Sequence, residues 1–208
     1  MSTNGHLIDL GRWKRRQHFD LYRALQQPFF SVTVNVEVTA LWQRCRTNRD
    51  ASFVLSALAA LLRAAAATEP MRLRLRGDEV WLHDRVGVGT TVSRPDETFG
   101  FARLDLASSE EAFQLAGRAA IEQAKQSASI DPMPGQDDLI YHTTLPWLRF
   151  TAFTNALSGS DSIPRVTFGK VFEDRGGFRM PVAVEVHHAL VDGLDVARFI
   201  DAFEAGVH

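Results

Sequence analysis

The stretch "EVHHALVDGLD", residues 185–195, gathers side chains that could move a proton where a buried strand ends. Side chains alternate between the two faces of a strand, so His188 shares a face with Val184 and Val186. A histidine that leaves an apolar face is partly desolvated, which depresses its pKa and keeps the ring neutral. A neutral imidazole accepts protons, so the pattern predicts that His188 is a general base.

Two other interpretations of this stretch stay open at this point. His188 could be a structural histidine at a strand end, hydrogen-bonded and without chemistry. Asp192 lies in a tight turn closed by Gly193, where a carboxylate can brace the loop or pair with a cation. His188 and Asp192 are also metal-ligand types, but a metal site needs a third ligand, and no HExxH or CxxC pattern supplies one. We therefore expect no metal.

The periodicity of the first half of the chain predicts elements that could position these residues. A short helix lies within residues 11–25. Residues 29–41 alternate at four valines, as a strand with one buried face does. Residues 53–67 form an apolar, Ala-rich helix, and residues 71–84 form a hairpin with its turn at Gly77.

The second half of the chain mixes the two periods. Residues 86–93 are predicted to form a strand interrupted by glycines. Residues 108–127 form a helix that begins with a serine cap and acidic residues, and residues 127–138 form a loop. Three strand-like segments follow, at residues 148–153, 165–172 and 180–187. The last segment, residues 195–208, has helical spacing, with Gly206 as its predicted stop.

Strands and helices do not alternate strictly along the chain, which argues against a doubly wound nucleotide-binding fold. We expect an α+β fold, a two-layer sandwich in which helices cover a mixed or antiparallel sheet. A chain of 208 residues, 45% of them hydrophobic, can fill one core. Residues 1–208 are therefore predicted to form a single domain.

Composition argues against several classes of partner. The chain has 23 basic and 25 acidic residues, and its net charge of -2 favours neither nucleic acid nor an acidic membrane surface. The longest apolar stretch, residues 53–67, contains Arg63 and is shorter than the roughly 20 residues that cross a bilayer. The single cysteine, Cys45, and an N-terminal stretch without an apolar run favour a cytoplasmic location.

The signature His-His-Ala-x-x-Asp-Gly after an apolar strand, followed by "VARFI", resembles the active-site motif of the chloramphenicol acetyltransferases. The looser form His-x-x-x-Asp-Gly is also found in dihydrolipoyl acyltransferase cores and in peptide-synthetase condensation domains. Four further segments resemble motifs of the chloramphenicol acetyltransferases in the same order, namely "WKRRQHFDLY", "LRLRGDEVWLHDRV", "TTLPWLRF" and "TFGKV". The resemblance spans nearly the whole chain and implies that family's fold and chemistry.

The resemblance gives the histidine and the aspartate different roles. It implies that His188 takes the proton of an acceptor hydroxyl while that oxygen attacks the thioester carbonyl of acetyl-CoA. Both substrates would be bound together, without an acyl-enzyme. Asp192 would pair with Arg15, or with Arg16 in the alternative register, and would hold the histidine loop in shape. We expect this ion pair to be buried, since exposed pairs contribute little.

Hydroxyl and amine groups elsewhere in the chain match further positions of the family. A serine that donates to the tetrahedral oxyanion corresponds to Thr143, with Thr144 beside it as the alternative donor. Thr143 could equally be a strand residue favoured by its β-propensity. Thr167 matches a threonine near the acetyl-transfer centre, and Lys170 matches a lysine that approaches the CoA phosphate.

The acceptor site implied by the resemblance contains both matches and departures. Tyr22 and Phe30 correspond to aromatic residues that line the chloramphenicol pocket. Tyr141 lies in the substrate-binding region, where the family has an asparagine. Leu21 and Val171 stand where the family has phenylalanine and tyrosine. These three departures motivate an alternative acceptor.

Three arginines of the predicted hairpin, Arg72, Arg74 and Arg76, share one strand face. They could meet the phosphates of CoA. We interpret them instead as a solvated face of the hairpin, the usual place for a row of charges.

The resemblance also implies a homotrimer with active sites at its subunit interfaces, where the histidine of one subunit faces the acceptor pocket of its neighbour. The leading hypothesis is an acetyl-CoA-dependent O-acetyltransferase that acts on chloramphenicol and so inactivates the antibiotic. A second hypothesis keeps the acyl transfer and changes the acceptor to another hydroxyl or amine of a biosynthetic pathway. A third is a non-catalytic small-molecule binding protein of the same fold.

Overall fold

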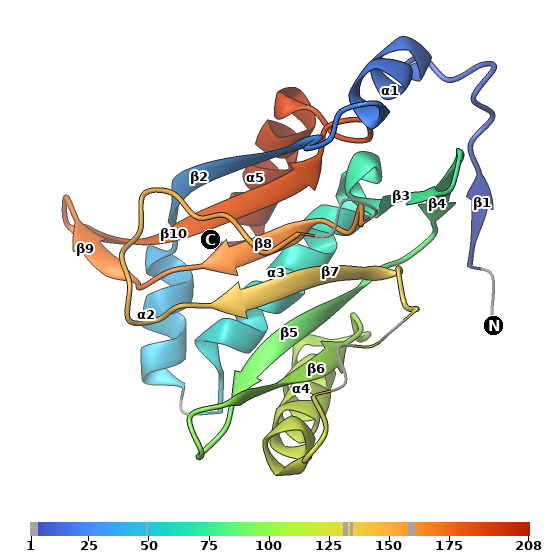
Figure 1. The fold of residues 1–208 in the computed structure, drawn as a ribbon. Coiled ribbons are helices and arrows are strands. Elements are labelled where there is room, and N and C mark those ends of the chain that lie inside the picture. The colour runs from blue at the N-terminus through green and yellow to red at the C-terminus, as the bar shows by residue number, and fades with distance from the viewer. Residues whose placement is uncertain (1–3, 49, 131–132, 134, 158–160) are drawn as a thin grey trace.

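A mixed sheet of seven strands forms the centre of the computed structural model (Figure 1). The structure describes residues 4–48, 50–130, 133, 135–157 and 161–208. The strands follow the order β2, β10, β8, β7, β5 and β6, with β9 paired to β10. β7 is parallel to β5 and β8, and the other pairs are antiparallel. The bounds are β2 Phe29–Glu37, β5 Gly87–Ser93, β6 Phe99–Leu104, β7 Leu139–Thr144, β8 Arg165–Phe168, β9 Phe172–Asp174 and β10 Gly177–His187.

Three long helices cover one face of this sheet (Figure 1). They are α3 (Phe53–Ala67), α4 (Glu110–Gln126) and α5 (Gly193–Val207). Ser52 and Ser109 cap α3 and α4, each accepting a bond from a backbone N–H of the first turn. The α+β sandwich with a mixed sheet that the sequence predicted is confirmed. None of the helices in the described ranges is long and apolar enough to span a membrane.

Residues 145–157, which follow β7, cross the other face of the sheet (Figure 1). Its Phe153 carbonyl accepts a 2.8 Å bond from the Ser31 hydroxyl of β2, and Asn155 donates to Glu185 of β10 over 2.9 Å. The prediction of a strand at residues 148–153 is therefore wrong. Pro146 has no N–H to continue the ladder, so the pairing of β7 ends before it and the chain turns away.

Two short helices lie outside this layer, α1 (Arg16–Arg23) and α2 (Thr39–Thr47). α1 falls inside the range predicted for it. α2 was not predicted, because the alternation of residues 29–41 read as one strand. The strand ends at Glu37, whose carboxylate accepts a 2.9 Å bond from the backbone N–H of Thr39 and so helps to start the helix.

The predicted hairpin is present and belongs to a separate small sheet in the order β1, β4, β3. Its strands are β1 Gly5–Leu7, β3 Leu73–Arg76 and β4 Glu79–His83, and the short 3-10 helix η1 (Glu69–Arg72) precedes β3. Gly77 takes a φ of 62° in the turn, a conformation that favours glycine. β1, at three residues, was too short to predict from its pattern.

Gly206 does not stop the last helix, as the sequence had predicted, because α5 continues to Val207. A Cβ at this position would lie 3.1 Å from the Cβ of Ala60 on α3. Gly206 therefore allows α3 and α5 to pack closely, and it does not mark the end of α5.

Candidate active site

His188 lies directly after β10, in the turn that leads to α5. Its backbone N–H donates to the carbonyl of Pro28 over 2.7 Å, which ties the turn to the chain before β2. Its ring Nδ1 lies 3.1 Å from the carbonyl of Val191. A carbonyl only accepts, so this contact places the ring proton on Nδ1. In the neutral ring Nε2 is then the free acceptor, the atom that a general base needs.

Two aromatic rings fix the plane of the His188 imidazole. Tyr22 of α1 stacks on it with 3.8 Å between ring centroids and 19° between planes, and the ring of Phe30 lies 4.7 Å away. Phe30 pairs with Val186 across the sheet, so the imidazole lies on the valine side, as strand alternation predicted. Figure 1 shows α1 beside the turn that carries it.

The fully buried histidine of the pair is His187, not His188. His187 is 3% exposed, and burial lowers its pKa to about 4. Its Nδ1 accepts a 3.2 Å bond from the backbone N–H of Ala189. His188 is only half-buried. The deepest burial of the pair thus falls on His187, because the strand ends there and the chain turns toward the surface, which leaves His188 partly buried.

Arg15 and Asp192 form the ion pair that the resemblance implied. Arg15 Nη1 lies 2.5 Å from Asp192 Oδ2, and Arg15 Nη2 donates to the carbonyl of His188 over 3.4 Å. The side chains are 12% and 39% exposed, so the pair is buried on the arginine side only. Arg16, the alternative partner, binds Asp20 instead. The pair ties the histidine turn to the segment that enters α1.

Asp192 has a second role that the sequence pattern did not predict. It is the N-cap of α5, and its carboxylate accepts bonds of 3.0 and 3.1 Å from the backbone N–H groups of Leu194 and Asp195. Burial alone would raise the pKa of Asp192, but the bonds from Asp195 and Arg15 hold it below its ordinary value. The carboxylate is therefore ionised at neutral pH and holds both the helix and the arginine.

Residues of a second group lie on β7 and β8, on the sheet face away from the long helices. Tyr141 pairs with Arg165 and Thr143 pairs with Thr167 in the parallel register. Thr144 pairs with the core residue Phe168, so it points the opposite way from Thr143. Of the two candidate oxyanion donors, Thr143 therefore shares a face with Thr167.

The hydroxyls of this group differ in their partners. Thr143 Oγ1 lies 2.7 Å from Thr91 Oγ1 of β5. Thr167 is 1% exposed, and its hydroxyl has no hydrogen-bond partner within the described ranges. A buried hydroxyl without a partner costs free energy, so such a group in a native fold asks for an explanation such as a ligand or water.

The two groups are far apart within one chain. Thr143, Thr167 and Ala183 are aligned across three strands, and His187 lies four residues beyond Ala183 on β10. With strands about 4.8 Å apart and residues about 3.3 Å apart along a strand, roughly 16 Å separates the Cα atoms of Thr143 and His187. Thr143 and His188 of one chain therefore lie in separate regions, and Thr143 faces away from the valine side of the sheet on which His188 lies.

Lys170 belongs to neither group. It is exposed in the break between β8 and β9, and its backbone N–H donates to the carbonyl of Leu148 over 2.8 Å. Its exposed side chain can reach a ligand in solvent. Val171, next to it, packs against the core.

Tyr141 faces charged residues. The guanidinium of Arg165 lies 5.5 Å from the centre of its ring, and Arg165 is paired with Asp161 in an ion pair that is largely buried. Burial raises the pKa of Tyr141. A hollow of about 1740 Å³ opens beside Tyr141, bordered also by Asp161, Asp137 and Arg103. The protein surface beside Thr143 is thus lined by polar and charged side chains.

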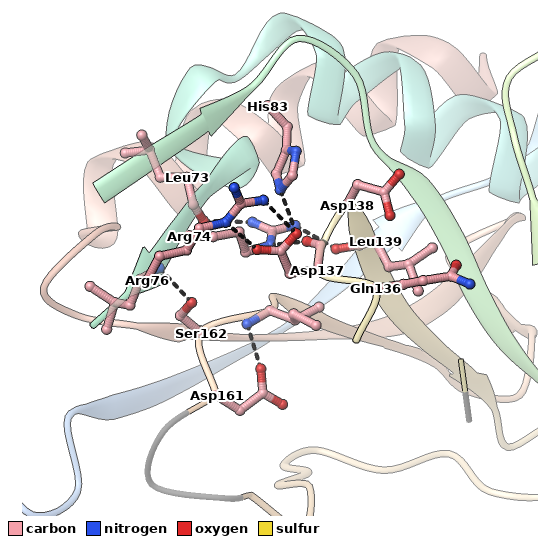
Figure 2. A network of polar contacts seen from close by, with 12 residues as sticks. Leu73, Arg74, Arg76, His83, Gln136, Asp137, Asp138, Leu139, Asp161 and Ser162 are labelled. Carbon is pink, nitrogen blue, oxygen red and sulfur yellow. Dashed lines mark hydrogen bonds and ion pairs between the residues drawn. The ribbon is translucent and has the colours of Figure 1, made fainter. Parts of the chain in front are cut away.

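The arginines of the hairpin do not form a solvated face, because Arg74 is 0% exposed. Figure 2 shows its guanidinium inside a network between the hairpin and the start of β7. It donates to the carbonyl of Asp137 over 2.6 Å, and to those of Leu73, Met71 and Leu139. Burial lowers its pKa to about 10, so it is still charged at neutral pH.

The outer part of this network is an ion pair. Arg76 binds the Asp137 carboxylate through two bonds of 2.8 and 3.0 Å, and His83 Nε2 lies 3.1 Å from the same carboxylate (Figure 2). The hairpin, the loop before β7 and β7 itself are thereby fastened together.

Comparison with known proteins gives a consistent picture. The family model described as chloramphenicol acetyltransferase matches residues 3–204. Chloramphenicol acetyltransferase 2 of Haemophilus influenzae is 28% identical over 95% of this chain and 94% of its own length. Chloramphenicol acetyltransferase 3 of Escherichia coli is 26% identical with the same coverage. A solved chloramphenicol acetyltransferase superposes with a TM-score of 0.90 at 26% identity, covering 98% of this chain and all of the other.

Proposed function

Because the chain belongs to the chloramphenicol acetyltransferase family, we propose that it transfers the acetyl group of acetyl-CoA to a hydroxyl of chloramphenicol. The family and the named relatives make the chain an acyltransferase. The observation that carries the finer proposal is the setting of His188, whose bond to Val191 leaves Nε2 as the proton acceptor.

His188 acts as the general base in this proposal. Nε2 takes the proton of the acceptor hydroxyl while that oxygen attacks the thioester carbon. The tetrahedral intermediate then expels the CoA sulfur, which takes the proton back from His188, and the new ester leaves with free CoA thiol. With both substrates held together no acyl-enzyme is needed, and orientation alone can lower the barrier by roughly 7 to 11 kcal/mol.

Thr143 donates to the oxyanion in the same proposal. Its hydroxyl lies on the sheet face away from the long helices, next to Thr167, whose unpartnered hydroxyl offers a second polar contact near the transferred group. Loss of one oxyanion donor costs about 2.7 to 4 kcal/mol in other enzymes. Thr143→Val should therefore lower kcat about a hundredfold or more.

We propose that the complete site lies between two copies of the chain, in a homotrimer. The support is the separation of roughly 16 Å between Thr143 and the strand end at His187 within one chain. A second copy can bring its own Thr143 to the His188 of the first. The acceptor would then lie against Tyr22 and Phe30 of the histidine group and against Thr143 of the neighbouring copy.

Lys170 is proposed to bind a phosphate of acetyl-CoA, since its side chain is exposed and positively charged. No metal is needed for this chemistry. A cytoplasmic location fits the co-substrate and the single cysteine, Cys45.

A different acceptor is the second candidate, and one observation favours it. The Arg165–Asp161 pair and Tyr141 give the wall beside Thr143 a polar, charged lining. An acceptor that carries a charged group can pair with these side chains, whereas chloramphenicol is uncharged and can offer them only neutral hydrogen bonds. The acyl transfer would be the same.

One assay tests both candidates. Protein, acetyl-CoA and an acceptor are mixed, and the release of free CoA thiol is followed for chloramphenicol and for a panel of polar alcohols and amines. We expect turnover with chloramphenicol that His188→Ala abolishes. Turnover only with other acceptors would support the second candidate. No turnover with any acceptor would contradict the enzymatic proposal and leave a binding protein of the same fold.

A further inference from the structure

The hydroxyl of Thr143 has a partner that the proposed function does not use. Thr91 of β5 lies next to Thr143 of β7, one residue beyond the last register pair of these parallel strands, Thr90 and His142. The two hydroxyl oxygens are 2.7 Å apart, and both residues are half-buried. This distance is typical of an O–H···O hydrogen bond.

The direction of this bond decides what Thr143 can do. A hydroxyl carries one proton and two lone pairs. If Thr143 donates to Thr91, its only proton is used within the pair. If Thr91 donates to Thr143, the proton of Thr143 is free to point away from the pair, toward a ligand on the sheet face. Thr167, on the other side of Thr143, has no hydrogen-bond partner in the described part of the chain and so does not hold that proton.

We propose that Thr91 is a positioning residue for acyl transfer, which donates to Thr143 and thereby turns the Thr143 proton toward the oxyanion. This inference rests on the proposed function. Negative charge on the thioester oxygen favours the direction Thr91 to Thr143 to oxyanion, because each bond of the chain polarises the next. The effect exists only when the charge develops, so Thr91 stabilises the transition state and not the bound substrates.

A neighbouring pair on the same two strands serves as a control. Thr90 Oγ1 lies 2.8 Å from His142 Nδ1, and both residues are buried on the opposite, helix-covered face. Thr90→Val removes a side-chain bond between β5 and β7 just as Thr91→Val does. It leaves the Thr91 and Thr143 pair intact. Any effect shared by the two variants is therefore structural.

The test compares Thr91→Val, Thr91→Ser, Thr90→Val, Thr143→Val and the double variant Thr91→Val with Thr143→Val, by thiol release with an acceptor that the wild type uses. We expect Thr91→Val to lower kcat between about threefold and tenfold, the range of one ordinary hydrogen bond, with both KM values unchanged. Thr91→Ser should restore kcat, because it restores the hydroxyl. Thr90→Val should keep kcat per folded molecule. The double variant should match Thr143→Val, since Thr91 acts through that hydroxyl.

Three results would overturn the inference. They are an unchanged kcat in Thr91→Val, no recovery in Thr91→Ser, and losses that multiply in the double variant. If Thr143→Val loses activity while Thr91→Val does not, the proposed function stands and only the role of Thr91 fails. If the wild type turns over no acceptor, the proposed function fails first and the role of Thr91 with it. Valine matches threonine in shape and β-propensity, so folding is expected and is checked by circular dichroism.

Discussion

Arg15 and Arg74 each fasten a distant segment to the end of a strand, and they do so with different partners. Arg15 binds the carboxylate of Asp192 and remains 12% exposed beside the half-buried His188. Arg74 is 0% exposed and donates to backbone carbonyls of the hairpin and of β7. The first region holds the turn at which we propose that the acceptor binds. The second holds a guanidinium that is sealed from water.

The difference teaches how each arginine contributes. A partly exposed ion pair supplies geometry and little net stability, because solvent screens it. A buried guanidinium has lost its water, so its carbonyl partners must all be present, and removing it leaves them without a donor. We therefore expect the Arg15 region to matter chiefly for activity and the Arg74 region chiefly for stability.

The largest expected effect is on stability. Arg74→Met should lower the free energy of unfolding by about 3 to 5 kcal/mol, since it leaves several buried carbonyls unpaired. Arg76→Met is the matched control, because its pair with Asp137 is partly exposed and should cost less than about 1 kcal/mol. Urea unfolding measures both. Equal losses in the two variants would contradict the contrast between buried carbonyl partners and exposed carboxylate partners.

As the pH falls, the histidine region should lose stability first, and the Arg74 region should lose it only at a lower pH. Burial lowers the pKa of His187 to about 4, while the unfolded chain takes up the proton near pH 6.5. The free energy of unfolding should therefore fall between pH 6.5 and 4, by at most about 1.4 kcal/mol per pH unit for this histidine. His187→Asn should flatten that slope in urea unfolding curves.

Asp137 of the second region should respond only at lower pH. Burial would raise the pKa of Asp137, but its bonds to His83 and Arg76 hold it well below 3.8. Its contribution is present above that pH and is lost as the pH falls through the lowered pKa. An Asp137→Asn variant that already changes the slope between pH 6.5 and 4 would contradict this order.

Asp192→Asn separates the two roles of that residue. Asparagine is also a good N-cap, so α5 should keep its start. The charged bond to Arg15 is lost, and kcat should fall about tenfold to a hundredfold through displacement of the histidine turn. Full activity with an unchanged fold would remove Asp192 from the positioning of His188. Thiol release and circular dichroism give the two readouts.

The smallest expected effect is at Thr144. It points to the same side as Phe168, and its hydroxyl lies 3.4 Å from His142 Nε2. Thr144→Val should therefore keep kcat within about twofold, far from the loss expected in Thr143→Val. If the two variants lost activity equally, the assignment of the oxyanion donor to Thr143 would be wrong.

The sequence predicted the histidine region better than the hairpin junction. His188, Asp192 and Arg15 stand in a signature of chemically distinctive side chains, and the structure brings them together. The acceptors of Arg74 are backbone carbonyls, which every residue has, so no pattern marks them. The row of arginines in the hairpin was therefore interpreted as a solvent-exposed face.

Strand alternation had similar limits. It placed His188 on the valine side and ended the strand at His187, as the structure does, but it could not show that the deepest burial falls on His187. Alternation also predicted a strand at residues 148–153, whereas the strand in this part of the chain is β7, which carries Tyr141 and Thr143. The bond between Thr91 and Thr143 depends on which strands are neighbours, and periodicity holds no information on that.

The central claim is that the base and the oxyanion donor come from different copies of the chain, and subunit mixing tests it most directly. His188→Ala and Thr143→Val proteins are each purified, unfolded, mixed in equal amounts and refolded together. Each variant alone should be nearly inactive. Random assembly should restore about a quarter of the wild-type sites, because half of the histidine positions and half of the threonine positions are intact. Mixtures that remain as inactive as the single variants would contradict a shared site.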